Sequence, residues 1–438
     1  MNRTILPINL TLKNDSSTSD NTVSVHLPGS KYIANRLLPL CALASTASVL
    51  SNVVDNDDIN AASQGLKALG YQLTYANSKL NVSPRPANYE FDSLITFNTQ
   101  HSGTFSRFVT AISALENVPV EISCSDKMAT RPMNELFDSL RELGVVINSE
   151  NDRLPAIIKG PVTTNYCQLD ASRSSQYLSA LLIIAPLLEN GLTIELQGKQ
   201  VSNAYVDMTI NLMNKMGVEV KRSGNTISVA AGQEYNGIIY NVPCDPVSSS
   251  YFMGFAAISG YKIKIESFDH QSLQGEAQFY KVLEKMGVIF EKDDSSLTII
   301  SDGELKGIEV DMSEMPDVVQ TLAVVASHAK GRTLIKNIAH LAFKESDRIK
   351  DTAAELMKAG IKVEAGDDYL LIEGGHPKAT EIETYDDHRM AMSMALLGTK
   401  TQNIVIKDAS VVNKSFPNYW DLMAQVGLTS KVLDLRNE

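Results

Sequence analysis

The chain has 438 residues, of which 44% are hydrophobic and 21% are charged, and its net charge is −12. This length predicts two or three globular domains, and the acidic balance argues against a general nucleic-acid binder. No apolar run reaches the ~18 residues of a membrane helix, and Met1–Leu10 lacks the features of a signal peptide. We therefore expect a cytoplasmic protein.

The first predicted elements are two strands, Ile5–Leu12 and Val23–Leu27, which precede a repeated unit. The unit is marked by glycines that follow helix-like runs at a spacing of about 70 residues: Gly70, Gly144, Gly217, Gly287, Gly360 and Gly427. Each stands where a helix end favours a left-handed residue. A second series of apolar, small-residue helices has the same spacing and begins near Arg36, Arg107, Gln176, Ser250, Gln320 and Arg389.

Each unit therefore contains a strand, a helix, a strand, a helix and two further strands, βαβαββ. The helices are apolar around much of their circumference, as in Leu178–Leu188, which predicts that they are buried. The predicted fold is α/β, a two-domain inside-out α/β barrel with three units in each domain, buried helices and outer sheets. We place an N-terminal domain at residues 28–244 and a C-terminal domain at residues 1–27 plus 245–438, with a hinge where the chain crosses near 28 and 244.

Neither a metal nor a cofactor is expected. The chain has no Walker loop, no dinucleotide-binding fingerprint and no His/Cys/Asp array at metal-ligand spacing. The cysteines are widely spaced, without a CxxC pair, and we interpret them as free thiols of a reducing compartment: Cys41, Cys124, Cys167 and Cys244.

Basic and hydroxyl residues gather where the repeat helices begin. Free N–H groups and the helix dipole make such ends anion sites when a cation is added. The segments are Pro28–Arg36, His101–Arg107, Lys127–Pro132, Ser172–Gln176, Lys344–Arg348, Asp387–Arg389 and Asn413–Pro417. One such segment alone could be a cap beside a solvated charge. Together they predict a cationic cleft for a small, multiply anionic ligand such as a phosphate or carboxylate.

Acid–base candidates lie among these cations. Glu345 stands between Lys344 and Arg348, and Asp317 follows a proline at the start of the fifth apolar helix. Nearby cations lower the pKa of a carboxyl group, which suits a base or a proton shuttle. An acid in a capping turn is the alternative for Glu345. Ser174–Ser175 lacks a histidine and a nucleophile-elbow context, which argues against a serine hydrolase.

These motifs in combination resemble the enolpyruvyl transferases, within them the enzymes that act on shikimate 3-phosphate, over nearly the whole chain. The motifs are Pro28–Lys31, Gly103–Arg107, Arg131–Pro132, Ser174–Gln176, Lys344–Arg348, Asp387–Met392 and Lys414–Pro417. The resemblance implies two domains of three βαβαββ units that close over phosphoenolpyruvate and shikimate 3-phosphate. It implies transfer of the carboxyvinyl group to the 5-hydroxyl with release of phosphate, in the pathway to chorismate and aromatic amino acids. We expect a monomer that binds neither nucleic acid nor membrane.

The resemblance also implies roles for individual residues. The catalytic residues would be Lys31, Asp317 as the base at the acceptor hydroxyl, and Glu345 as the proton carrier to and from the methylene carbon. Phosphoenolpyruvate would be bound by Lys31, Gly103, Arg131, Gln176, Arg348, Arg389 and Lys414. The acceptor would be bound by Lys31, Tyr32, Arg36, Ser174, Ser175, Gln176, Ser202, Tyr205, Asp317, His340 and Lys344.

Several positions depart from the family pattern, most of them around the acceptor. Tyr32 stands where the family has a small serine, and His340 stands where it has an asparagine. Further departures are His101, Ser102, Phe105, Ser106 and Phe108. The donor is therefore predicted more firmly than the acceptor. The alternatives are an enolpyruvyl transferase for another cyclic acceptor and a non-catalytic phosphoanion-binding relative.

The related enzymes that act on UDP-N-acetylglucosamine are a further alternative. They carry a cysteine five residues before their Arg-Pro pair. Asp126 stands there in this chain, and Cys124 is out of register.

Overall fold

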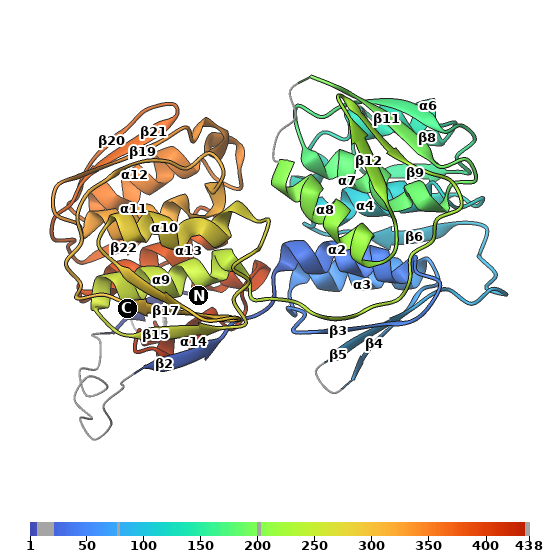
Figure 1. Ribbon diagram of the computed structural model, residues 1–438. Coiled ribbons are helices and arrows are strands. Elements are labelled where there is room, and N and C mark those ends of the chain that lie inside the picture. The colour runs from blue at the N-terminus through green and yellow to red at the C-terminus, as the bar shows by residue number, and fades with distance from the viewer. Residues whose placement is uncertain (7–21, 77–78, 199–202, 434–438) are drawn as a thin grey trace. The chain divides into compact units, whose positions relative to one another are not determined.

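The computed structural model describes residues 1–6, 22–76, 79–198 and 203–433. The chain separates into two compact units. One is Gly29–Val242, the N-terminal unit, and the other joins Met1–Pro28 to Pro243–Glu438, the C-terminal unit. Figure 1 shows the first in blue to green and most of the second in yellow to red. Among the described residues, no helix combines the length and the apolar character that crossing a membrane would need.

The N-terminal unit is built from helices and four-stranded sheets. Its repeat helices are α2 (Lys31–Ala42), α3 (Asp57–Ala68), α4 (Gly103–Ser113), α6 (Asn134–Glu142), α7 (Ser175–Ile184) and α8 (Asn203–Lys215), with the short α5 (Asp126–Ala129) and η1 (Ala185–Leu187) between them. Its described strands form sheets in the orders β14-β3-β5-β4, β6-β7-β9-β8 and β10-β11-β13-β12. The first two strands of each sheet are parallel and the others antiparallel.

The strands of this unit are short. They are β3 (Ser48–Ser51), β4 (Gln72–Ala76), β5 (Lys79–Ser83), β6 (Ile95–Asn98), β7 (Val120–Ser123), β8 (Val146–Ser149), β9 (Ala156–Lys159), β10 (Tyr166–Asp170), β11 (Leu192–Gln197), β12 (Val220–Ser223), β13 (Thr226–Val229) and β14 (Ile239–Asn241).

The C-terminal unit repeats this plan. Its helices are α9 (Pro246–Ser259), α10 (Phe279–Lys285), α11 (Val319–Ser327), α12 (Arg348–Lys358), α13 (His388–Ala395) and α14 (Tyr419–Gln425), with the 3-10 turns η2 (Gly275–Gln278), η3 (Pro316–Val318), η4 (Ala339–Phe343), η5 (Leu396–Thr399) and η6 (Ala409–Lys414). Its described strands form sheets in the orders β16-β17-β15-β2, β18-β19-β21-β20 and β22-β23-β1-β24.

The strands of the C-terminal unit come from both ends of the chain. They are β1 (Arg3–Ile5), β2 (Val23–His26), β15 (Ile263–Glu266), β16 (Ile289–Lys292), β17 (Ser296–Ile300), β18 (Glu309–Asp311), β19 (Arg332–Lys336), β20 (Lys362–Ala365), β21 (Tyr369–Glu373), β22 (Thr380–Ile382), β23 (Ile404–Ile406) and β24 (Ser430–Val432). Strand β2 pairs in parallel with β15, and β1 lies antiparallel to β23 and β24. The predicted strand Ile5–Leu12 overlaps β1 only at Ile5, and its residues 7–12 lie outside the described part of the chain.

The glycine series confirms the predicted helix ends. The six glycines have φ between 81° and 110°, the left-handed region that closes a helix. Three helices of the second series begin within one residue of the predicted position: α7 at Ser175, α11 at Val319 and α13 at His388. The other three begin earlier than predicted, α2 at Lys31, α4 at Gly103 and α9 at Pro246.

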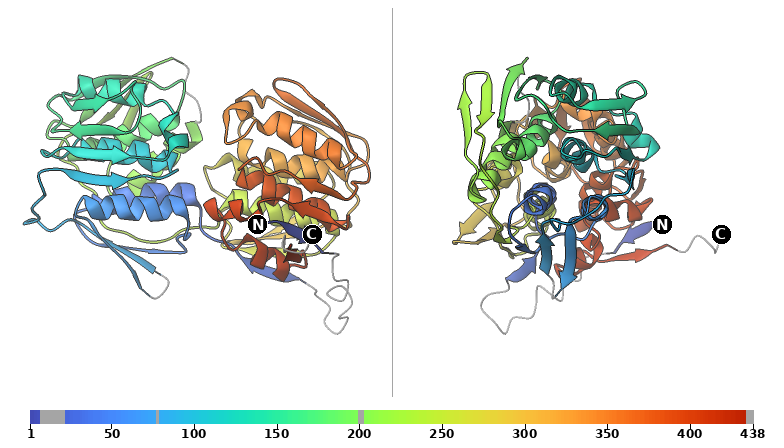
Figure 2. Two further views of the ribbon diagram at one scale, coloured as in Figure 1. Left: turned by 180° about the vertical axis from the view of Figure 1, so that it is seen from behind. Right: turned by 90° about the vertical axis from the view of Figure 1, so that its right-hand side faces the viewer.

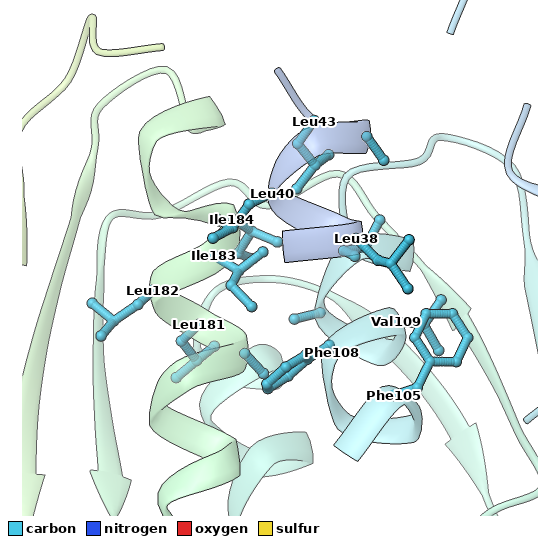
Figure 3. Close-up of a cluster of buried hydrophobic side chains, with 14 of the residues drawn as sticks. Leu38, Leu40, Leu43, Phe105, Phe108, Val109, Leu181, Leu182, Ile183 and Ile184 are labelled. Atoms are coloured by element: carbon cyan, nitrogen blue, oxygen red, sulfur yellow. The ribbon is translucent and has the colours of Figure 1, made fainter. Parts of the chain in front are cut away.

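The predicted inside-out arrangement is confirmed by burial. In the view from behind in Figure 2, the strands of each unit lie around its helices. Helices α4 and α7 are buried at nearly every position, which explains their apolar sequence. Figure 3 shows side chains of three helices meeting in the core of the N-terminal unit, among them Leu40 of α2, Phe108 of α4 and Ile183 of α7.

The two segments that connect the units run side by side. The Asp245 N–H group donates to the Pro28 carbonyl oxygen at 3.0 Å. A Cβ atom on Gly29 would lie 2.8 Å from a side-chain carbon of Val242 and 2.1 Å from the Asn52 carbonyl oxygen. Only glycine permits this approach of the two segments.

Candidate active site

A buried arginine in the C-terminal unit binds three carboxylates. Arg348 is the first residue of α12 and is 1% exposed. Its Nη1 donates to Asp317 at 3.0 Å, its Nη2 to Glu345 at 2.7 Å and its Nε to Asp387 at 2.7 Å. Burial lowers the pKa of Arg348, but the charges of Asp387 and Glu345 outweigh it and raise that pKa above its ordinary value. The cation therefore holds three acids in fixed positions.

Asp317 lies at the centre of this network. It belongs to the 3-10 turn η3, which begins with Pro316 and leads directly into the buried helix α11. One carboxylate oxygen accepts from Arg348, and the other accepts from Nη2 of Arg389 at 2.9 Å. Asp317 is 8% exposed, and each of its carboxylate oxygens accepts from an arginine.

Glu345 is bound by cations from two elements. Besides Arg348, the Nζ atom of Lys414, at the end of η6, lies 3.6 Å from its Oε1 atom. Burial raises the pKa of Glu345, but the positive charge of Arg348, followed by His388 and Lys414, lowers it well below its usual range. Glu345 is therefore a carboxylate at neutral pH while these cations surround it.

A rigid turn positions Arg389 at the start of α13. The Asp387 side chain caps the helix by accepting from the Arg389 N–H group at 2.9 Å. Tyr385 and Asp386, which directly precede Asp387, both have a φ of 54°, which is unusual for residues other than glycine. The buried Glu355 accepts from the Tyr385 hydroxyl at 2.6 Å and so helps to hold the turn. Strained backbone of this kind often occurs at functional sites.

Two of the three predicted acceptor residues of this unit make no hydrogen bond to this network, in the part of the chain that the structure describes. His340 and Lys344 are both exposed, within and just after η4. Burial and the charge of Lys344 lower the pKa of His340, while Asp317 and Glu314 act in the opposite direction. His340 therefore lies close enough to Asp317 and Glu314 to experience their charges.

In the N-terminal unit, the predicted acceptor arginine is deeply buried. Arg36 is 1% exposed, and burial lowers its pKa to about 10. Its Nε donates to Thr209 Oγ1 at 2.8 Å, and its Nη1 to the Tyr32 carbonyl oxygen at 2.9 Å. The guanidinium lies 5.6 Å from the ring centre of Phe108 and 5.7 Å from that of Tyr205. The arrangement stabilises the cation by hydrogen bonds and aromatic faces.

Tyr32 forms an aromatic pair with Tyr205 of α8. Their ring centres are 5.3 Å apart, and the planes are tilted by 43°. The Nζ atom of Lys31 lies 5.8 Å from the Tyr32 ring centre and 3.3 Å from Asp58 Oδ2. Lys31, Tyr32, Arg36 and Tyr205 thus form one cluster at the start of α2.

The start of α4 is crowded by two guanidinium groups. A Cβ atom on Gly103 would lie 2.7 Å from Nη1 of Arg131 and 3.0 Å from Nη1 of Arg107. Arg107 donates to the Gly103 carbonyl oxygen at 2.8 Å and to the Pro132 carbonyl oxygen at 3.2 Å. It therefore ties the helix start to the segment that carries Arg131. Any side chain at position 103 would displace these cations.

Helix α7 adds polar side chains to the same region. Gln176 Nε2 donates to Thr104 Oγ1 at 3.1 Å, and Ser174 caps the helix by accepting from the Gln176 N–H group at 3.2 Å. Ser175 is 8% exposed at the first position of the helix. Ser202, the other predicted acceptor residue of this unit, lies outside the described residues.

Sequence reasoning missed one acid at the site. Glu276, in η2, is 1% exposed, and its Oε1 accepts from the Asp317 N–H group at 3.4 Å. The repeat pattern offered no signal for it, because η2 precedes α10 and lies outside the helix starts where the cations gather. Among the described residues, His, Cys, Asp and Glu form no group of three or more that could hold a metal ion.

Comparison with known proteins gives one consistent result. The family model described as EPSP synthase (3-phosphoshikimate 1-carboxyvinyltransferase) matches residues 17–423. A protein of that name from Nostoc punctiforme is 36% identical over 410 residues, which cover 92% of this chain and 96% of the relative. A namesake from Hamiltonella defensa is 36% identical over 413 residues, covering 93% and 96%.

The fold has the same relatives. A solved structure of EPSP synthase from Acinetobacter baumannii superimposes with a TM-score of 0.83 at 25% identity, covering 99% of this chain and 100% of that one. The similarity thus extends through both compact units.

Proposed function

The chain belongs to the EPSP synthase (3-phosphoshikimate 1-carboxyvinyltransferase) family, and on that premise we propose how its residues carry out the reaction. The reaction transfers the carboxyvinyl group of phosphoenolpyruvate to the 5-hydroxyl of shikimate 3-phosphate and releases phosphate. It is a step of the shikimate pathway. It needs a base at the hydroxyl, a proton carrier at the methylene carbon and fixed positive charge around both anionic substrates.

The observation that supports this assignment best is the sharing of Arg348 by Asp317 and Glu345. Two carboxylates bound to separate nitrogens of a single guanidinium supply two proton-transfer groups close to one another. Arg389 and Lys414 complete a set of cations suited to a phosphate and a carboxylate. A protein that only binds phosphate would gain nothing from two acids in this place.

In the addition step, the 5-hydroxyl oxygen attacks C2 of phosphoenolpyruvate. Asp317 takes the hydroxyl proton, and Glu345 gives a proton to the methylene carbon, so that a tetrahedral ketal phosphate forms. In the elimination step, Glu345 takes a proton back from the new methyl group while the bond from C2 to the phosphate oxygen breaks. The proton held by Asp317 leaves with the phosphate, and the enolpyruvyl ether remains.

The charge state of Glu345 sets an order of events. In the free protein its neighbours lower its pKa, so it carries no proton to give. A bound phosphoenolpyruvate brings negative charge to the same cations and offsets their effect on Glu345. We infer that Glu345 takes up a proton from solvent, and so becomes an effective acid, only when the donor is bound, which limits proton transfer in its absence.

The remaining residues bind substrate in this proposal. In the N-terminal unit, Lys31, Gly103, Arg131 and Gln176 are assigned to phosphoenolpyruvate, and Lys31 also has a catalytic role as a counter-charge. The acceptor is assigned to Lys31, Tyr32, Arg36, Ser174, Ser175, Gln176, Ser202, Tyr205, Asp317, His340 and Lys344. The cluster of Tyr32, Arg36 and Tyr205 supports a carboxylate site, because it combines a guanidinium with two phenol groups.

We propose that the protein acts as a monomer in the cytoplasm. The four free cysteines, Cys41, Cys124, Cys167 and Cys244, support a reducing compartment. Light scattering coupled to size-exclusion chromatography tests the monomer, and a mass near 47.8 kDa is expected. A mass of twice that value would overturn this part of the proposal.

Phosphate release tests the function. Purified protein is mixed with phosphoenolpyruvate in the presence and absence of shikimate 3-phosphate. We expect phosphate to form only when both are present. Release with a different cyclic acceptor, and none with shikimate 3-phosphate, would show that the acceptor is another compound.

A further inference from the structure

One buried acid of the C-terminal unit has no part in the mechanism above. Glu276 lies in η2, in the sequence Gln274-Gly275-Glu276, and is 1% exposed. Burying a carboxyl group costs free energy unless it has hydrogen-bond partners. Its place beside the proposed base therefore calls for a physical reason.

Two successive residues of η2 contact the segment that ends in Asp317. The Glu276 Oε1 atom accepts from the Asp317 N–H group at 3.4 Å. A Cβ atom on Gly275 would lie 1.9 Å from the carbonyl oxygen of Glu314, so the bare backbone of Gly275 packs against that residue. The two contacts hold Glu314 and Asp317, the two ends of a four-residue segment. Residues of η2 therefore hold this segment in place, directly before α11 in the chain.

The charged groups that act on Glu276 directly are Asp317 on η3 and Arg389 on α13. Glu314 is the other acid of the segment 314–317, and α10 contributes the buried Tyr280. Helix α9, which also packs against η2, contributes Tyr251 as its titratable residue, and the charged residues of α10 are exposed: Lys281, Glu284 and Lys285. Burial, followed by the charge of Asp317, raises the pKa of Glu276 to about 8. At neutral pH Glu276 is therefore mostly protonated and uncharged, so it does not compete with Asp317 for Arg389.

We infer that Glu276 is a positioning residue for the reaction: together with Gly275, it fixes the segment 314–317 and so the direction in which the Asp317 carboxylate points. The inference rests on the proposed function, because Asp317 is the base in that proposal. A displaced base loses proton transfer more than it loses substrate binding, since alignment matters in the transition state. Loss of Glu276 should therefore lower kcat more than it raises either KM.

Four proteins test this: wild type, Glu276→Gln, Glu276→Ala and the control Glu284→Gln. Glutamine keeps an oxygen that can accept from the Asp317 N–H group, so Glu276→Gln should retain kcat within about threefold at pH 7, whereas Glu276→Ala should lose about 10-fold to 100-fold. Both KM values should change by less than about threefold. Glu284 lies exposed on α10, and its variant should match wild type.

A pH profile separates positioning from a merely structural role. As pH rises through about 8, wild-type Glu276 gains a negative charge that repels Asp317 and competes for Arg389. The kcat of wild type should fall in that range, and the kcat of Glu276→Gln, which cannot ionise, should not. If Glu276→Ala does not fold, the comparison of wild type with Glu276→Gln still decides.

Each contrary result has a clear meaning. A kcat of Glu276→Ala equal to that of wild type would overturn the inference. Identical pH profiles for wild type and Glu276→Gln would also overturn it. These results would leave the proposed function intact, since wild-type turnover is measured in the same assay. A wild-type protein that releases no phosphate with shikimate 3-phosphate would overturn the proposed function and, with it, this inference.

Discussion

Glu345 and Asp317 are bound to separate nitrogens of one guanidinium, so each can be changed without removing the other's partner. Glu345→Gln should keep the hydrogen bond to Arg348 but cannot carry a proton. We expect kcat to fall by about 10²–10⁴-fold, with a much smaller change in KM for phosphoenolpyruvate. Steady-state phosphate release measures both. Glu373→Gln, at a partly exposed acid of β21, serves as the control, and near-normal turnover of Glu345→Gln would refute the proton-carrier role.

Tyr32 is the second residue whose exchange is informative. Its ring pairs with Tyr205 beside Arg36, which is 1% exposed. A serine would remove the ring and open the guanidinium to the acceptor carboxylate. With shikimate 3-phosphate as substrate, Tyr32→Ser should therefore turn over at least as fast as wild type, with KM for phosphoenolpyruvate unchanged.

Tyr32→Phe is the matched control, because it keeps the ring and removes only the hydroxyl. A loss of more than about tenfold in kcat/KM for shikimate 3-phosphate in both variants would show that the acceptor needs the Tyr32 hydroxyl itself and that a serine hydroxyl does not replace it. If the native acceptor is another compound, Tyr32→Ser combined with His340→Asn should raise activity on shikimate 3-phosphate above that of wild type.

At this scale, the sequence predicts residue types better than contacts. Helix starts rich in Arg, Lys and Ser indicate anion binding because the chemistry depends on local backbone groups. The bond from Asp387 to Arg348 and the contact of Glu276 with Asp317 join segments 39 and 41 residues apart. No local pattern predicts them. The burial of Arg36 under Tyr205 likewise depends on the packing of α2 against α8.

At the scale of elements, the glycine that ends each repeat helix contributes a measurable part of the free energy of unfolding. Gly287 has a φ of 110°, and a Cβ atom there would meet only the Glu304 carbonyl oxygen, at 3.5 Å. Gly287→Ala should thus suffer backbone strain with little steric conflict and lose about 1–2 kcal/mol of unfolding free energy. Urea denaturation measures this. Gly375, without a positive φ, is the control, and equal effects of Gly→Ala at both positions would contradict the account.

The repeat period reveals which segments are strands and helices, because alternation and helix ends are local signals. It does not reveal the strand with which each first strand pairs. Strand β2 lies in the segment predicted to join the C-terminal domain and pairs there with β15, and β14 pairs with β3. Such short apolar strands fit more than one sheet edge, and the path of the connecting segments decides between them. Gly29, pressed against Val242 and Asn52, helps to fix that path.

At the scale of the whole molecule, each compact unit contains all the described strands of its own sheets. We propose that the units are domains. Residues 29–242, produced alone, should then fold and unfold cooperatively in urea, because their core and sheets are complete without the rest of the chain. Circular dichroism measures the transition. A fragment without a cooperative transition would show that the C-terminal unit is needed for folding.

In the proposed reaction, the acids bound to Arg348 carry the protons while the carboxyvinyl group passes from phosphoenolpyruvate to the 5-hydroxyl of shikimate 3-phosphate. The most direct measurement follows both products in one reaction, phosphate and the enolpyruvyl ether, by phosphorus and proton magnetic resonance. Wild type should form phosphate and the ether in equal amounts, and only when both substrates are present. Phosphate without the ether, or an ether at another hydroxyl, would contradict it.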